Sequence, residues 1–180
     1  MYWGKKLKIS NKNTIMKKII LLFYLAFSTS LLFAQNTQGV GFFAPQPEEK
    51  FIAGSDDITK LWADYIEAHN KQDMEKIMSM NSDSIYIQAP NGSTIVGKEQ
   101  HKNFLTAWFK AENPKWEIYW AMPYRSVPSG ADWIIAGHRE STTVNGKKVI
   151  KNAMIDVEIT DGLIRRFFVY TMDLPDEASN

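Results

Sequence analysis

The stretch "NGKKVIKNAMIDVEITDGLIRR", residues 145–166, sets the fold because a tight-turn signal lies at each end of one strand pattern. Asn145-Gly146 and Asp161-Gly162 are typical of two-residue hairpin loops, since both central residues of a type I′ turn need a positive φ. The pattern therefore predicts three antiparallel strands. Counting outward from the turns pairs Ile135 with Asp156, and Asp156 with Phe167. The same count pairs Arg139 with Asn152, and Asn152 with Thr171.

Upstream of this region the spacing of apolar residues changes at Pro114. After Pro114 they recur at every second residue, and before it they recur about every 3.6 residues. From Trp116 the apolar residues alternate, as expected for a strand. Before Pro114 the pattern predicts a helix beginning at Ser55 or Asp56, a short helix capped by Asp73, a strand–turn–strand unit, and a third helix over residues 98–111. The fold class expected is α+β, with three N-terminal helices packed on a curved, mostly antiparallel sheet that forms a cone-shaped barrel.

Both faces of the predicted sheet are substantially apolar. Our pairing puts Asp156 on one face with Ile135, Asn152, Met154 and Phe167, and it puts His138 on the opposite face. An antiparallel sheet usually leaves one face to water, so the second apolar face predicts a homodimer through the outer sheet face.

The N-terminus has the pattern of a signal peptide. Met16, Lys17 and Lys18 precede an apolar run over residues 19–33, and Ala34 follows. A membrane anchor is the alternative, but the run is shorter than the ~20 residues of a spanning helix. We expect no stable anchor and a secreted or periplasmic protein after cleavage near Ala34. Residues 1–15 are interpreted as an overcalled start.

The remaining domain boundaries follow from composition. Residues 35–54 mix Gly, Pro and polar residues and are interpreted as a linker or loosely docked arm. Residues 55–175 form the expected domain, and 176–180 a tail. The 180 residues, 44% hydrophobic, fit one compact domain.

Composition excludes several kinds of function. The absence of cysteine excludes disulfides, thiolate metal sites and a cysteine nucleophile. Of 21 Lys and Arg, six lie in residues 1–34, while all 20 Asp and Glu follow; removing that segment leaves 15 against 20, a net charge of −5. No nucleic-acid partner is therefore expected. The three histidines lack metal-ligand spacing, and no cofactor motif occurs, so neither metal nor cofactor is expected.

The order of elements, together with "DYIEAHNKQDMEKI", "SIYIQAPNG" and residues 145–166, resembles the ketosteroid isomerase and SnoaL-like cone-shaped domains of the nuclear transport factor 2-like superfamily. The resemblance covers about residues 56–174. It implies that Tyr65 matches the isomerase tyrosine and Asp156 the protonated acid of the oxyanion hole. Ala89, with Gln88 beside it, falls where the isomerase has its base, so that base is absent.

Four residues are candidates for catalysis. Asp156 would be costly to bury unpaired, so it is expected either to bond a partner such as Tyr65 or to lie at a wet strand end. Tyr65 either acts on a ligand or packs in the core. His101 and His138 are possible proton carriers; a packed ring explains the first as well, and a bulge would be needed to bring the second to a pocket.

Aromatic side chains exceed what a small core needs and predict an apolar pocket. The expected ligand-binding residues are Trp62, Tyr86, Phe104, Trp108, Trp120, Ile135, Asn152, Met154 and Phe167. The favoured function is binding of a small hydrophobic molecule. The alternatives are an isomerase-, cyclase- or hydrolase-type enzyme acting on a small cyclic carbonyl compound, and a purely structural dimerisation domain.

Overall fold

The computed structural model describes residues 16–20 and 39–174. The chain divides into two units, residues 1–37 and 38–180. In the first, residues 16–20 are helical, and the rest of the expected signal sequence, with its cleavage point, lies outside the described residues. Across the described ranges, no helix has both the length and the apolar character needed to cross a bilayer.

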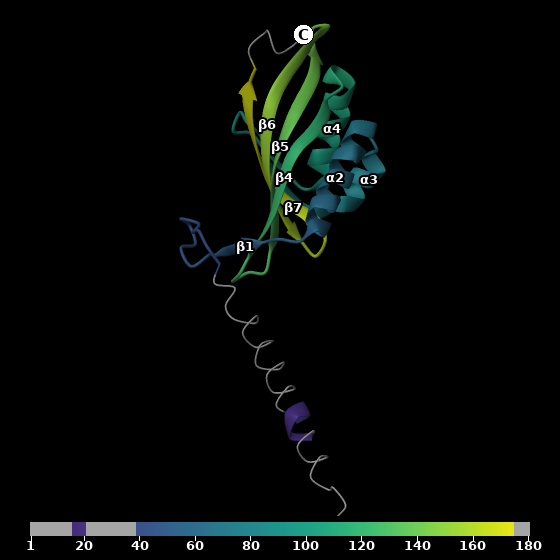
Figure 1. The fold of residues 1–180 in the computed structure, drawn as a ribbon. Coiled ribbons are helices and arrows are strands. Elements are labelled where there is room, and N and C mark those ends of the chain that lie inside the picture. The colour runs from purple at the N-terminus through teal and green to yellow at the C-terminus, as the bar shows by residue number, and fades with distance from the viewer. Residues whose placement is uncertain (1–15, 21–38, 175–180) are drawn as a thin grey trace, which may run out of the picture. The chain divides into compact units, whose positions relative to one another are not determined.

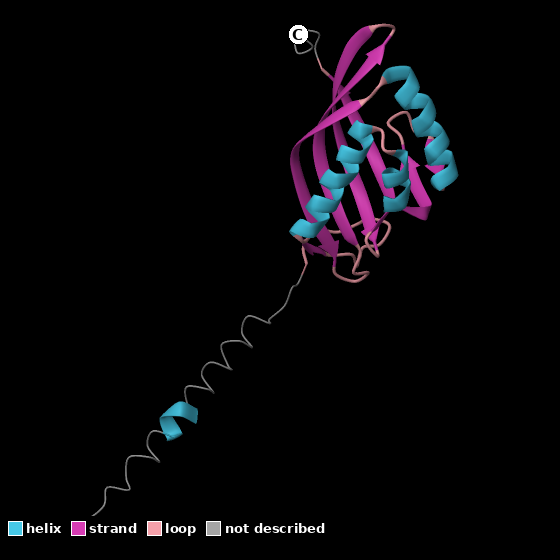
Figure 2. Cartoon of the chain, turned by 90° about the vertical axis from the view of Figure 1, so that its right-hand side faces the viewer, coloured by secondary structure: helices cyan, strands magenta, loops and turns pink. Residues whose placement is uncertain are grey.

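The second unit is a sheet with helices on one face, as Figures 1 and 2 show. The elements are β1 (Phe51–Ala53), α2 (Asp56–Lys71), α3 (Met74–Met80), β2 (Asn81–Gln88), β3 (Thr94–Val96), α4 (Lys98–Glu112), β4 (Lys115–Ser126), β5 (Asp132–Val144), β6 (Lys147–Thr160) and β7 (Leu163–Asp173). Within residues 39–174 the seven strands are ordered β1-β4-β5-β6-β7-β2-β3, and only the β2–β7 pair is parallel. The predicted fold class is confirmed, with a curved sheet that stays open.

The predicted caps and turns are present. Ser55 caps α2 by accepting from the amide of Asp57, and Asp73 caps α3 through the amide of Lys76. Asn145 and Asp161 have φ of 52° and 53°, and the φ of the glycine after each is also positive. Both hairpins therefore have the two-residue loops that the sequence predicts.

The register between β5 and β6 is as predicted, whereas that between β6 and β7 is wrong by one residue. Ile135 pairs with Asp156, and Arg139 with Asn152. Asp156, however, pairs with Phe168 instead of Phe167, and Asn152 with Met172 instead of Thr171. The cause is a bulge in β7: Glu158 pairs with Arg166 and Ile159 with Ile164, so Arg165 is the extra residue and every later pair of β7 is shifted by one.

The residues of β5 and β6 divide between the two faces as predicted, but the helices cover the face opposite to the one that was expected to line a pocket. The face covered by helices carries Ile134, Ala136 and His138 of β5, all fully buried, with Ala153, Ile155 and Val157 of β6. Asp156 and Met154 lie on the outer face. Over this central part of the two strands the helix-covered face takes the positions without a carboxylate, and the charged Glu140 and Lys151 of the same face lie at one end of the cavity. Phe167 reaches that face because the bulge moves it opposite Val157.

The segment interpreted as a linker contributes a strand to the sheet. Phe51–Ala53 pairs with Tyr124–Ser126 at the edge of β4. Just before it, the buried Glu49 carboxylate accepts a hydrogen bond from the Ser126 hydroxyl. Residues 49–53 are therefore docked on the domain.

Candidate functional site

A cavity of about 610 Å³ lies between the helices and the inner face of the sheet. Its residues come from α2, β2, β3, α4 and the central strands. The apolar and aromatic lining includes Trp62, Tyr65, Ile66, Ile87, Phe104, Leu105, Trp108, Trp116, Ile155, Phe167 and Val169. Four of the predicted ligand-binding residues are in this lining, namely Trp62, Phe104, Trp108 and Phe167.

Tyr65 begins a buried chain of hydrogen bonds that ends at the cavity. Its hydroxyl donates to Asn81 Oδ1 at 2.8 Å, and the amide of Asn81 donates to His101 Nδ1 at 3.0 Å. A ring that accepts at Nδ1 carries its proton on Nε2. Burial, with a smaller effect from His69, lowers the pKa of His101 to about 3, so the ring is neutral at pH 7.

His69 is a second neutral imidazole in the cavity lining. Its Nδ1 lies 2.9 Å from the Tyr65 carbonyl oxygen, which can only accept, so Nδ1 carries the proton and Nε2 is an acceptor. Burial lowers the pKa of His69 to about 4. The ring centroids of His69 and His101 are 6.2 Å apart. Among the described residues, neither Nε2 atom has a hydrogen-bond partner, and neither is fully enclosed, so both face open volume.

His138 lies in the core beside the cavity and does not line it. Trp62 Nε1 donates to His138 Nε2 at 3.0 Å, and the ring is fully buried on the helix-covered face. Burial lowers the pKa of His138 to about 4. The expectation that it lies on the outer face was therefore wrong, although its predicted pairing with Ala153 is found.

Asp156 does not meet Tyr65. It accepts a hydrogen bond of 2.6 Å from the Tyr124 hydroxyl on the outer face, and burial raises its pKa. Tyr65 is bonded to Asn81 on the opposite face. The predicted pair is separated because adjacent positions of one strand point to opposite faces, and Ile155 takes the inner one.

The other predicted ligand-binding residues are absent from the cavity lining for the same reason. Ile135, Asn152 and Met154 share the outer face with Asp156. Trp120 pairs with Gly137 across that face, and Tyr86 packs on Phe168, with ring centroids 6.3 Å apart.

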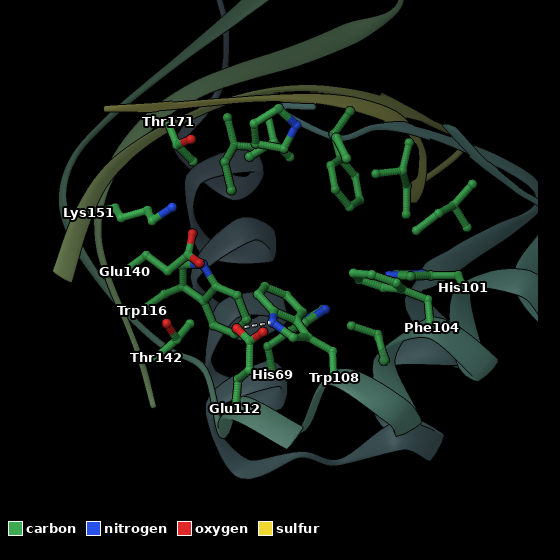
Figure 3. A pocket seen from close by; sticks show the side chains of 18 of the residues that line it. His69, His101, Phe104, Trp108, Glu112, Trp116, Glu140, Thr142, Lys151 and Thr171 are labelled. Atoms are coloured by element: carbon green, nitrogen blue, oxygen red, sulfur yellow. Dashed lines mark hydrogen bonds between the residues drawn. The ribbon is translucent and has the colours of Figure 1, made fainter. Parts of the chain in front are cut away.

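One end of the cavity, here called the polar end, carries Glu112, Thr142, Glu140, Lys151 and Thr171. Figure 3 shows these side chains on one side, with His101 and Phe104 on the other. Trp108 Nε1 donates to Glu112 Oε2 at 3.0 Å. Burial raises the pKa of Glu140; the charge of Lys151 and a hydrogen bond from Trp116 oppose this effect, and the charge of Glu112 adds to it.

Three features of this site were missed from the sequence. His69 was not a candidate, although it stands on the apolar stripe of α2, which is a signal of burial. Asn81 belongs to no recognisable motif, because its link between Tyr65 and His101 exists only in the folded chain. The proximity of Glu112 and Glu140 was missed because one lies at the end of α4 and the other on β5, far apart in the sequence. Across the described ranges, no group of three or more His, Asp or Glu side chains is placed to hold a metal.

Comparison with known proteins identifies the class of fold to which this chain belongs. No protein-family model and no curated protein matches the sequence. Among solved structures, an LEH-like epoxide hydrolase from M. tuberculosis is similar at a TM-score of 0.53 and 13% identity, covering 63% of this chain and 80% of that one. The epoxide hydrolase/cyclase-like enzyme SalBIII has a TM-score of 0.55 and 18% identity, covering 63% and 89%.

A protein of ketosteroid isomerase-like fold from Catenulispora acidiphila has a TM-score of 0.52 and 12% identity, covering 61% of this chain and 83% of that one. At these identities the likeness concerns the fold. The chain has the cone-shaped α+β fold of the ketosteroid isomerase-like and SnoaL-like proteins of the nuclear transport factor 2-like superfamily, as the sequence resemblance predicted.

Proposed function

We propose that this domain binds a small, largely apolar molecule in the cavity between α2, α4 and the sheet. The observation that carries the proposal is the cavity itself. Its volume of about 610 Å³ lies within the ~300–1,000 Å³ range of small-molecule sites, and its walls are apolar with few polar groups. The Nε2–H of His101 would orient the ligand by donating to an acceptor such as a carbonyl oxygen.

The test is to fill the cavity and measure ligand retention. Val169→Trp places an indole in the lining of the cavity. We expect small molecules that copurify with the wild-type chain, identified by extraction and mass spectrometry, to be lost from this variant. Val127→Trp, at an exposed loop position, is the matched control and should retain them. A wild-type chain that releases nothing, and binds no member of an apolar compound library, would refute the proposal.

A second candidate function is an isomerase-, cyclase- or hydrolase-type reaction on a small cyclic carbonyl compound. It is favoured by the two neutral imidazoles of the cavity, one with an accepting Nε2 and one with a donating Nε2–H. His69 would take a proton while His101 holds the developing oxygen charge. His69→Gln should then abolish turnover without abolishing binding, and turnover that survives this substitution would exclude His69 as the base.

We also propose that two copies associate through the outer sheet face. Met122, Tyr170 and Met172 on that face are 57%, 55% and 61% exposed, which gives an apolar surface of the kind that association covers. Met122→Lys combined with Tyr170→Lys should shift the mass measured by light scattering from dimer to monomer. A monomeric wild-type chain would refute this part.

Export is proposed from the signal pattern of residues 16–34. N-terminal sequencing of the protein recovered from its native cells should give Gln35 as the first residue. A chain that begins at Met16, or one retained in the cytoplasm, would contradict export.

A further inference from the structure

The polar end of the cavity is dominated by hydrogen-bond acceptors. Glu112 and Glu140 present carboxylates, and His69 presents the lone pair of Nε2. His69 is only 6% exposed, and this nitrogen has no partner among the residues that the structure describes. The ring is nine-tenths buried, but its Nε2 is not among the fully enclosed atoms without a partner, so this acceptor opens to the cavity, where a ligand can donate to it. The acceptors therefore call for a ligand that donates hydrogen bonds.

The charges around these acceptors are not balanced within the described part of the chain. Lys151 lies opposite Glu140 in the β5–β6 register, but its ammonium pairs with Asp173 Oδ1 at 3.3 Å. Lys115 donates to the carbonyl of Asn70, at the end of α2. Glu112 is bonded to the neutral indole of Trp108. Glu140 has the neutral indole of Trp116 and the charge of Lys151 beside it, so the two carboxylates have one ammonium group near them, and that group also pairs with Asp173.

The position of Glu112 adds to this negative potential. It is the last residue of α4, where the unpaired carbonyl groups carry partial negative charge and a cation is favoured. A carboxylate there is unfavourable on its own. The arrangement becomes favourable when a positive charge from outside the chain lies between Glu112 and Glu140.

The aromatic walls next to the polar end suit a cation too. Trp108 and Trp116 pack edge to face with ring centroids 5.3 Å apart, and Phe104 packs on Trp108 at 5.4 Å. Figure 3 shows Trp108, Trp116 and His69 together next to Glu112. A protonated amine over an indole face gains a cation–π interaction in addition to its ion pairs.

We propose that the cavity selects ligands in which a protonated amine is joined to an apolar body. This inference rests on the proposed binding function and names its ligand class. The ammonium group lies between Glu112 and Glu140 at the polar end and donates to His69 Nε2. The apolar body extends along Leu105 and Phe167 toward His101.

The test compares three probes that share one apolar body. Binding of 4-phenylbutylamine, 4-phenylbutan-1-ol and 4-phenylbutyrate to the purified full chain is measured by titration calorimetry at pH 7.5. We expect the amine to bind at least tenfold more tightly than the alcohol, and the carboxylate to bind most weakly. Glu112→Gln and Glu140→Gln should each lower amine affinity about tenfold and change alcohol affinity less than twofold. Glu117→Gln, exposed on β4, removes the same charge outside the cavity and should change neither.

The outcomes separate this inference from the function on which it rests. Equal binding of amine and alcohol would overturn the amine preference and leave ligand binding in place. Tightest binding of the carboxylate would assign the polar end to Lys151 as an anion site and overturn it as well. An equal loss of amine affinity in Glu117→Gln would show a general charge effect and refute the local site. No binding of any probe, with no copurified molecule, would refute both proposals.

Discussion

Protonation of His138 should be a main source of acid instability in this protein. The ring is fully buried, accepts from Trp62 Nε1 at 3.0 Å, and has a pKa lowered by burial from 6.5 to about 4. In the unfolded chain the same ring takes a proton near pH 6.5. Because the folded pKa is the lower one, the contribution to stability is complete above pH 6.5 and is lost as pH falls toward 4.

The magnitude follows from the size of the shift. At pH 5 the unfolded ring is about 1.5 pH units below its pKa while the folded ring is still neutral. At about 1.36 kcal/mol per unit, the free energy of unfolding falls by about 2 kcal/mol between pH 7.5 and pH 5. That is a large part of the ~5–15 kcal/mol of a typical domain.

The assay is urea unfolding at both pH values, followed by far-ultraviolet circular dichroism. His69 and His101 act in the same direction, and the raised pKa values of Glu140 and Asp156 act in the opposite direction, so wild type and variant are compared. In His138→Gln, whose amide can still accept from Trp62, the loss on acidification should be about 2 kcal/mol smaller.

A control and a second variant make the test decisive. Lys148→Gln changes an exposed residue of the hairpin and should keep the wild-type pH dependence. His138→Asn offers a smaller replacement if the glutamine variant does not fold. A variant that loses as much stability as wild type between pH 7.5 and pH 5 would refute the reasoning, because the folded ring would then titrate as it does in the unfolded chain.

Three further substitutions test other parts of the structure. Tyr65→Phe leaves the buried Asn81 oxygen without its donor, and urea unfolding should show a loss of about 1–3 kcal/mol; no loss would mean that the amide finds another donor. In Gly137→Ala the new Cβ would lie 2.1 Å from Trp120 Nε1, so the indole must move; the tryptophan emission should shift to the red, and an unchanged spectrum would contradict the packing. Asp156→Asn should change ligand affinity by less than twofold, measured by calorimetry, because this residue lies on the outer face; a tenfold loss would return it to the site.

The sequence predicted the local structure well because its signals are local. Caps at Ser55 and Asp73 and the two Gly-containing turns each act within a few residues. Two-residue loops fix the β5–β6 register, so Ile135 opposite Asp156 could be counted from Asn145-Gly146.

The candidate site could be predicted only in part, because it depends on which sheet face the helices cover. Both faces are apolar, so the alternation of side chains along β6 does not show whether Asp156 or Ile155 lies on the helix-covered face. The bulge at Arg165 has no sequence signal as strong as a turn, yet it determines that Phe167 lines the cavity. His69 and Asn81 acquire their roles through contacts between distant segments.

The parallel pairing of β2 with β7 bears on how this chain folds during synthesis. It joins Tyr86 to Arg166, so the ribosome must finish nearly the whole domain before the partner of β2 is available. Until then the apolar stripes of α2 and α4 have no Phe167 or Val169 to face. A nascent chain stopped before Leu163 would lack one wall of the cavity and would expose a strand edge prone to aggregation. The cavity is therefore complete only after the last strand has been synthesised and has paired with β2.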